Sequence, residues 1–105
     1  MTIDEIIEQI GARLGAAVPP RSKVVLFGSQ ARGDARDGSD FDVLVIEPAV
    51  TDVAVESVRL DAQLRGLGVP VDVVVVDEAT ARRRAAVRGT MVERALREGQ
   101  VLVES

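Results

Sequence analysis

The sequence predicts an α/β (α+β) fold in which helices pack on a small mixed β-sheet. Two observations support it. Three short apolar segments have the composition of strands, at 23–27, 41–46 and 69–76, and amphipathic stretches with helical spacing lie around them. The connection between the first two strands is too short for an ordinary helical crossover. We therefore expect that pair to be antiparallel.

The first element is predicted to be a helix over residues 3–18. Its apolar residues recur at helical spacing and form one stripe. Thr2 is a suitable N-cap, and Glu5 stands three residues later, where it completes a capping box. Pro19 and Pro20 then stop the helix.

Strands and helices alternate through the middle of the chain. After the strand at 23–27, Gly28 and Ser29 begin a short helical turn, and a loop rich in turn-forming residues leads to the strand at 41–46. A helix is expected over 51–67, with Val53, Leu60, Leu64 and Leu67 on one apolar line. The third strand, 69–76, is almost continuous valine, which indicates burial on both faces.

The C-terminal part is helical in composition. Gly89 is expected to divide it into helices at 78–87 and 90–98, with Gly99 as the C-cap of the second. The apolar residues 101–103 suggest a short strand at the edge of the sheet.

Length and composition bound the function. The chain has 105 residues, which suits one domain over 1–105. It contains neither Cys nor His, which excludes a disulfide framework, a thiolate nucleophile, a His base and a usual zinc site. Acid–base and metal chemistry must then use carboxylates, whose oxygens suit Mg²⁺ or Mn²⁺.

Charge and hydropathy bear on partners and location. The net charge of −4 argues against general affinity for nucleic-acid backbones. Phe27 and Phe41 are the only aromatic residues, so base stacking on aromatic faces is not expected. The N-terminus lacks the pattern of a signal peptide, and no apolar stretch is long enough to span a membrane. We expect a cytoplasmic protein.

The first candidate site motif is Gly28-Ser29, directly after a buried strand. A glycine there allows a sharp turn and a close approach to a ligand. A helix that starts at Ser29 would offer N–H groups to a phosphate, and Arg32 and Arg36 would lie near further phosphate oxygens. The alternative is an ordinary turn with a capping serine.

The second motif is Asp40-Phe41-Asp42 at the start of the next strand. Alternate residues of a strand face the same way, so Asp40 and Asp42 are expected to project together, opposite Phe41. Two adjacent carboxylates repel each other unless a cation lies between them. The alternative is a solvated start of a strand, against which Asp42 argues as a second acid within an apolar segment.

The third motif is a single acid, Asp72, within the valine-rich strand. An unpaired carboxylate is costly to bury. Asp72 is therefore either exposed on an edge strand or placed beside Asp40 and Asp42 to complete a triad. Asp77 is a weaker candidate, because a role as helix N-cap explains it fully.

Three carboxylates without a histidine fit phosphoryl transfer with two metal ions. In this hypothesis Asp40 and Asp42 bridge both ions. Asp72 binds the first ion and is placed to take the proton of the acceptor.

These motifs, taken together, resemble those of a known family. Gly28-Ser29, ten intervening residues and Asp40-x-Asp42 are similar to the signature of the DNA polymerase β-like nucleotidyltransferase superfamily. The stretch GSQARGDARDGSDFDVLV resembles its small prokaryotic branch, the minimal nucleotidyltransferases. The resemblance implies that fold and places Gln30 in the phosphate site, although relatives often carry a basic residue there.

The resemblance also implies a partner. Many minimal nucleotidyltransferases are antitoxins of helical HEPN-type toxins and transfer AMP from ATP to the toxin. This chain is expected to use ATP or another NTP and such a toxin as acceptor. The alternative is a non-catalytic antitoxin that acts by covering its partner. A metal-dependent sugar transferase with an Asp-x-Asp motif is disfavoured, because it needs a larger domain.

The last unusual feature is the run Arg82-Arg83-Arg84, which is followed by Arg88, Arg94 and Arg97 and is diluted by Glu93 and Glu98. Three consecutive residues of a helix cannot all face one side, so a solvated helix face is the simpler interpretation. A docking surface for an acidic partner or for phosphates is the alternative.

Overall fold

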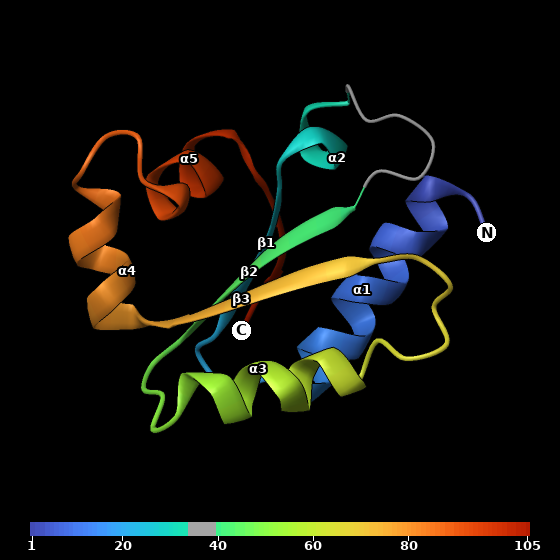
Figure 1. The fold of residues 1–105 in the computed structure, drawn as a ribbon, viewed down its shortest axis with the longest axis horizontal. Helices are drawn as coiled ribbons and strands as arrows, with labels where there is room; N and C mark the ends of the chain where they lie inside the picture. Colours follow the sequence, from blue (N-terminus) through green and yellow to red (C-terminus); the bar gives the residue numbers. More distant parts are fainter. Residues whose placement is uncertain (34–39) are drawn as a thin grey trace.

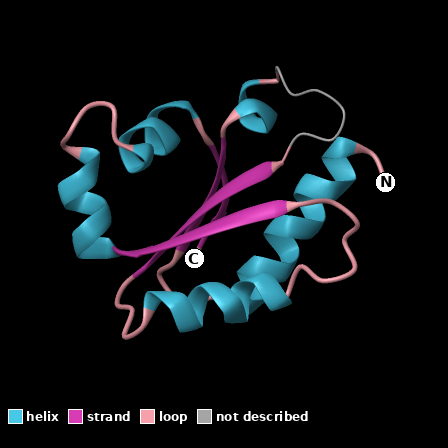
Figure 2. Cartoon of the chain, in the orientation of Figure 1, coloured by secondary structure: helices cyan, strands magenta, loops and turns pink. Residues whose placement is uncertain are grey.

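A computed structural model describes residues 1–33 and 40–105. Within them, the chain forms a four-stranded sheet and five helices (Figures 1 and 2). In chain order the elements are α1 (Ile3–Ala17), β1 (Lys23–Phe27), α2 (Ser29–Arg32), β2 (Phe41–Glu47), α3 (Val53–Ala62), β3 (Val71–Asp77), α4 (Glu78–Ala85), α5 (Met91–Glu98) and β4 (Gln100–Glu104).

The sheet is mixed, as predicted, with the strand order β3-β2-β1-β4. Strand β1 pairs antiparallel with β2, which confirms the inference from the short connection, and also antiparallel with β4. Strand β3 pairs parallel with β2 across the α3 crossover. The short strand expected near the C-terminus is therefore confirmed as one edge of the sheet.

Helices cover both faces of the sheet and leave a core on each. Figure 1 shows α1 and α3 on one side of the strands and α4 and α5 on the other. Residues of β2 alternate between the two cores: Phe41, Val43 and Val45 pack under α1 and α3, whereas Leu44 packs with Ala95 of α5. The period-two pattern of a strand thus assigns each side chain to one face.

Local capping explains where the helices begin. Thr2 accepts a hydrogen bond from the Glu5 backbone N–H, and the Glu5 side chain accepts one from the Thr2 N–H, as in the predicted capping box. Asp77 accepts a hydrogen bond at 2.7 Å from the backbone N–H of Thr80. Its predicted role as N-cap of α4 is confirmed.

Helix α3 is shorter than the predicted 51–67. It ends at Ala62, and turns follow. Leu60, Leu64 and Leu67 are buried as expected, but Val53 is 49% exposed. The predicted apolar line does not hold over its full length, because Leu64 and Leu67 enter the core from the turns rather than from the helix.

Strand β3 differs from its prediction. The valine run indicated burial on both faces, but β3 is an edge of the sheet, and Asp72 is exposed. Val75 and Val76, near its C-terminal end, are buried. Burial grows toward that end, where α4 follows the strand directly.

The C-terminal elements follow the prediction closely. Gly89 has a φ of +91° and lies between α4 and α5. Gly99 ends α5, where an added Cβ would lie 2.6 Å from Val25 Cγ1 and 2.7 Å from the Leu26 carbonyl oxygen. The absence of a side chain at Gly99 therefore lets the chain pass closely over β1.

A buried acidic network lies at the far end of β2. Glu47 is 3% exposed, and burial together with a hydrogen bond to Glu56 raises the pKa of Glu47 to about 7. Glu56 accepts two hydrogen bonds of 2.7 Å from Arg59, and these lower the pKa of Glu56 to about 2. Arg59 also donates to the Ala17 carbonyl at 2.8 Å, which ties α3 to the end of α1.

The helices in the described part of the chain were also compared with the length and hydropathy of a membrane span. None of them is both long and apolar enough to cross a bilayer.

Candidate functional site

The turn after β1 passes directly over a carboxylate. Gly28 has φ +76° and ψ −157°, a conformation open almost only to glycine. A Cβ on Gly28 would lie 2.5 Å from Oδ2 of Asp42. Gly28 is therefore required both by the backbone conformation and by the close approach to Asp42. Its carbonyl accepts a hydrogen bond of 3.2 Å from the Arg32 N–H, at the start of α2.

Asp42 stands on the face of the sheet that α4 and α5 cover. Its strand neighbours Phe41 and Val43 belong to the opposite core. In the antiparallel ladder Asp42 lies opposite Phe27, and in the parallel ladder it lies opposite Asp72. Directly paired residues of a sheet share a face, so Asp42 and Asp72 are neighbours, as predicted from sequence.

The environment of Asp42 disfavours its charged form. Burial is the largest cause of its raised pKa, followed by repulsion from Asp72 and from Asp40, while the Arg32 cation acts in the opposite direction. Both of the other predicted acids thus act electrostatically on Asp42. A divalent cation would relieve that repulsion.

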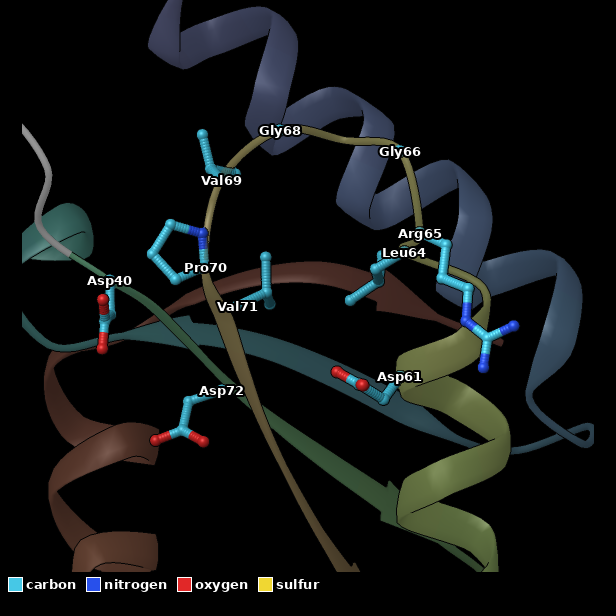
Figure 3. A pocket seen from close by; sticks show the side chains of 10 residues that line it. All are labelled: Asp40, Asp61, Leu64, Arg65, Gly66, Gly68, Val69, Pro70, Val71 and Asp72. Carbon is cyan, nitrogen blue, oxygen red and sulfur yellow. The ribbon is translucent and has the colours of Figure 1, made fainter.

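Asp40 and Asp72 line one cavity at the start of β2 and β3. The cavity measures about 580 Å³ and also includes Asp61 of α3. Figure 3 shows the carboxylates of Asp40 and Asp72 near each other at one end and that of Asp61 on the helix. Asp61 was not predicted, because only the crossover brings α3 beside this end of β3.

The three aspartates have the ligand chemistry that a hard cation requires, but their side chains do not converge on one metal position. Asp40, Asp42 and Asp72 supply carboxylate oxygens, which Mg²⁺ and Mn²⁺ prefer. In the described ranges 1–33 and 40–105, no three acidic side chains converge closely enough to hold a metal as they stand. The side chains must turn toward a common point for a cation to bind.

A second cavity lies beside the Gly28 turn, and Asp42 is part of its lining. It measures about 310 Å³ and its lining consists of Phe27, Gly28, Ser29, Arg32, Asp42, Arg94 and Glu98. The predicted phosphate residues Gly28, Ser29 and Arg32 are thus brought together next to Asp42. Gln30 lies on α2 but outside this lining, and Arg36 lies outside the described residues.

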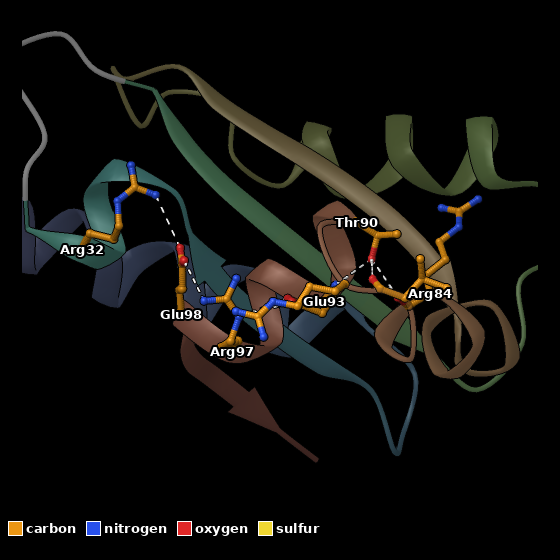
Figure 4. A network of polar contacts seen from close by, with 8 residues as sticks. Arg32, Arg84, Thr90, Glu93, Arg97 and Glu98 are labelled. Atoms are coloured by element: carbon orange, nitrogen blue, oxygen red, sulfur yellow. Dashed lines mark hydrogen bonds and ion pairs between the residues drawn. The ribbon is translucent and has the colours of Figure 1, made fainter.

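Helix α5 contributes two lining residues: Arg94, which the alternative interpretation of the arginine run had offered to phosphates, and Glu98, which was not predicted in the site. Arg94 and Glu98 are four residues apart and therefore share one side of the helix. Glu98 Oε2 lies 3.7 Å from Arg32 Nη1 (Figure 4). The i,i+4 spacing was visible in the sequence, but nothing in it indicated that α5 packs beside β1.

The run Arg82-Arg83-Arg84 lies on the exposed surface of α4. Arg82 pairs with Glu78, and Arg83 donates to the Thr80 hydroxyl at 3.2 Å. These contacts within one helix agree with the interpretation of a solvated face.

The chain was compared with solved structures and with curated sequences. A nucleotidyltransferase from Sulfolobus solfataricus, provisionally assigned as such, has a TM-score of 0.64 at 24% identity over 95% of this chain and 78% of its own. A toxin–antitoxin structure with AMP-PNP has a TM-score of 0.67 at 21% identity over 93% and 73%. A mutant of the toxin–antitoxin MntA-HpeT has 0.64 at 17% over 100% and 75%. No curated protein matches.

These similarities establish the fold, because they extend over nearly the whole chain. The family follows from a separate finding. The model of the nucleotidyltransferase domain matches residues 3–100, a range that includes Gly28-Ser29 and all three aspartates. The chain belongs to the nucleotidyltransferase domain family.

Proposed function

We propose that this protein transfers a nucleoside monophosphate, AMP from ATP, to a partner protein in a reaction that depends on Mg²⁺ or Mn²⁺. The observation that carries the proposal is the position of Asp42. It lies beneath the Gly28 turn and lines one cavity with Ser29 and Arg32, and its partner in the neighbouring strand, Asp72, lines a second cavity with Asp40. This is where the triphosphate and the acceptor would have to meet.

In this proposal the two cavities have different roles. Ser29 and Arg32 would bind the phosphates by hydrogen bonds and charge, and Gln30 and Arg36 of the same segment would add contacts. Asp40, Asp42 and Asp72 would hold the cation, which neutralises charge on the triphosphate.

In the proposed reaction one bond to phosphorus forms, one breaks, and a carboxylate of this chain takes up the released proton. The acceptor oxygen forms a bond to the α-phosphorus, and the bond from that phosphorus to pyrophosphate breaks. Asp72 is exposed at the edge of the sheet, where a carboxylate is placed to accept the proton that the acceptor hydroxyl loses.

The proposed acceptor is a HEPN-type toxin, for which this chain would act as an antitoxin in the cytoplasm. Two of the similar structures are toxin–antitoxin proteins, and one of them contains the ATP analogue AMP-PNP. An exposed macromolecular acceptor also suits a site whose carboxylates Asp40 and Asp72 lie in an open position at the end of the sheet.

A second candidate is a non-catalytic antitoxin that neutralises its partner by binding alone. The finding that favours it is that the three aspartates do not converge into a finished metal site in the described residues. Val55 and Val58, three residues apart on one face of α3, are 64% and 69% exposed, and adjacent exposed apolar side chains are typical of a binding surface.

Labelled nucleotide separates the two candidates. The purified protein is incubated with Mg²⁺ and α-labelled ATP, with and without the protein encoded by the neighbouring gene. We expect label on the partner, and none with the Asp40→Ala/Asp42→Ala variant. Asp4→Ala serves as the matched control, because Asp4 lies on α1 and lines neither site cavity. A stable complex that never acquires label would support the non-catalytic candidate.

A further inference from the structure

Helix α5 forms a wall of the cavity beside the Gly28 turn. Arg94 and Glu98 line it together with Ser29, Arg32 and Asp42. The helix is held there by Val92 and Ala95, which are fully buried against the sheet. Its polar residues therefore have a fixed position relative to the site.

The arginines near α5 differ in how their charges are used. Arg97 lies 3.2 Å from Glu93, and Arg88 lies 3.9 Å from the same residue. Arg94 has no ion pair or side-chain hydrogen bond in the parts of the chain that the structure describes. Arg94 lines a cavity that Arg32 also lines, and two cations on one cavity favour an anion between them.

Glu98 partly supplies that anion. Its Oε2 lies 3.7 Å from Arg32 Nη1, and its Oε1 lies 3.2 Å from Arg97 Nη1. Figure 4 shows Glu98 between the two arginines. A phosphate that binds Arg32 must compete with this carboxylate. After the exchange the Glu98 carboxylate would still have an ion pair, because Arg97 stays beside it.

We propose that Arg94 is a phosphate-binding residue of this site and that Glu98 is an internal competitor, which holds Arg32 until a nucleotide polyphosphate displaces it. The proposal rests on the proposed function and adds α5 to its binding site. The ligand is a nucleoside triphosphate, because two arginines and Ser29 on one cavity match several phosphate oxygens. In the exchange Arg32 gives up its ion pair with Glu98 for one with a phosphate, and no covalent bond is made or broken.

The two residues have opposite predicted effects on affinity. Arg94→Ala removes a charge-assisted contact and should weaken Mg·ATP binding about tenfold or more. Glu98→Gln removes the competitor, whose exposed ion pair is weak, and should tighten binding by roughly two- to fivefold. Since Arg94 acts on phosphates, Arg94→Ala should weaken ATP binding more than AMP binding.

Matched controls remove the same charges elsewhere. Arg88→Ala removes an arginine that is 85% exposed and pairs with Glu93 outside the cavity. Glu104→Gln removes an exposed glutamate that lies 3.6 Å from Lys23 at the other end of β1. Each control should change the affinity for Mg·ATP by less than about twofold.

Isothermal titration calorimetry of the full chain with Mg·ATP and with AMP tests the proposal, at one fixed ionic strength. Ligand-free melting temperatures verify that each variant folds. Weaker ATP binding in Arg94→Ala together with tighter binding in Glu98→Gln, against unchanged controls, supports it. If the wild type binds Mg·ATP and Arg94→Ala binds it equally well, this inference is overturned and the proposed function is not. A wild type that binds no Mg·ATP overturns the proposed function as well.

Discussion

At the scale of single residues, Asp42 lowers the stability of the metal-free fold although the proposed activity requires it. Its pKa is raised by burial and by repulsion from Asp72 and Asp40. A carboxyl whose pKa is higher in the folded state loses stabilisation as the pH rises through that value. At neutral pH without a cation, the charged Asp42 therefore lowers the stability of the fold.

We predict that Asp42→Asn abolishes nucleotidyl transfer while it leaves the metal-free melting temperature unchanged or slightly higher. The amide keeps the shape of the side chain and removes the repulsion. Thermal unfolding in EDTA and the labelled-ATP reaction measure the two effects. A large fall in the metal-free melting temperature would contradict a repulsive carboxylate cluster.

Gly28 carries a second prediction at this scale. Gly28→Ala adds a Cβ within 2.5 Å of the Asp42 carboxylate and is strained at φ +76°. Gly33→Ala also stands at a positive φ, +79°, but its ψ of 11° is in the left-handed helical region, which is less restricted to glycine than the conformation of Gly28. No described residue lies within 4 Å of its new methyl group. Strain alone costs roughly 1–3 kcal/mol.

We therefore expect Gly28→Ala to lower the free energy of unfolding more than Gly33→Ala does. The excess should shrink in the Gly28→Ala/Asp42→Ala double variant, because the clash is lost. Denaturant unfolding of the four proteins measures it. Equal effects of the two single variants would show that the close approach to Asp42 has no energetic consequence.

The Glu47 network predicts a pH dependence. The pKa of Glu47 is about 7 in the folded protein, against an ordinary value of 4.5. Between these values the folded state binds more protons than the unfolded state, so stability falls as the pH rises. Glu56 acts in the opposite direction only below pH 4.5, since its pKa is lowered to about 2.

We predict that the wild type loses stability from pH 5 to pH 7.5 and that Glu47→Gln loses less. The neutral amide cannot ionise in the buried position. Melting temperatures across this range measure the difference, and Glu8→Gln on the exposed face of α1 is the control. A Glu47→Gln variant with the same pH slope as the wild type would contradict the raised pKa.

At the scale of elements, most of the fold could be predicted because local signals were strong. The Thr2 capping box, the glycine at position 89 and the Asp77 N-cap mark helix ends through contacts within a few residues. The short connection between β1 and β2 decided their direction. Each of these signals depends only on residues close together in the sequence, so it can be read without knowledge of the tertiary structure.

The parts that could not be predicted depend on distant contacts. The valine run of β3 did not reveal an edge strand, because strand order is set by the crossover through α3. The end of α3 at Ala62 was missed because Leu64 and Leu67 keep an apolar pattern beyond the helix.

The candidate site divides in the same way. The motif brought Gly28, Ser29 and Asp42 together in the prediction, and the register of β2 and β3 places Asp72 beside them. Arg94 entered the prediction only as one of several arginines that could contact phosphates, and Glu98 was missed, because α5 reaches the site only by packing on β1.

At the scale of the whole molecule, ligand binding should be visible as stability. A ligand that binds only the folded protein raises the free energy of unfolding by about 2.7 kcal/mol at one hundred times its Kd. For a domain of this size, each 1 kcal/mol raises Tm by roughly 4–8 °C.

We predict that Mg·ATP or Mn·ATP raises the Tm of the wild type by several degrees and that of Asp42→Asn by much less. Thermal unfolding at millimolar nucleotide measures the shift, with ATP in EDTA as the control for the cation. No shift with Mg·ATP would contradict the site as a whole.

The central claim is that Asp40, Asp42 and Asp72 bind a divalent cation beside the Gly28 turn. The most direct measurement is the backbone amide NMR spectrum during titration with Mn²⁺ in the presence of ATP, since the paramagnetic ion broadens nearby resonances. We expect broadening first at residues 27–30, 40–43 and 71–73, and no such broadening in Asp42→Asn. Broadening centred on Glu47 and Glu56 instead, or none at the sheet end near Asp42, would contradict it.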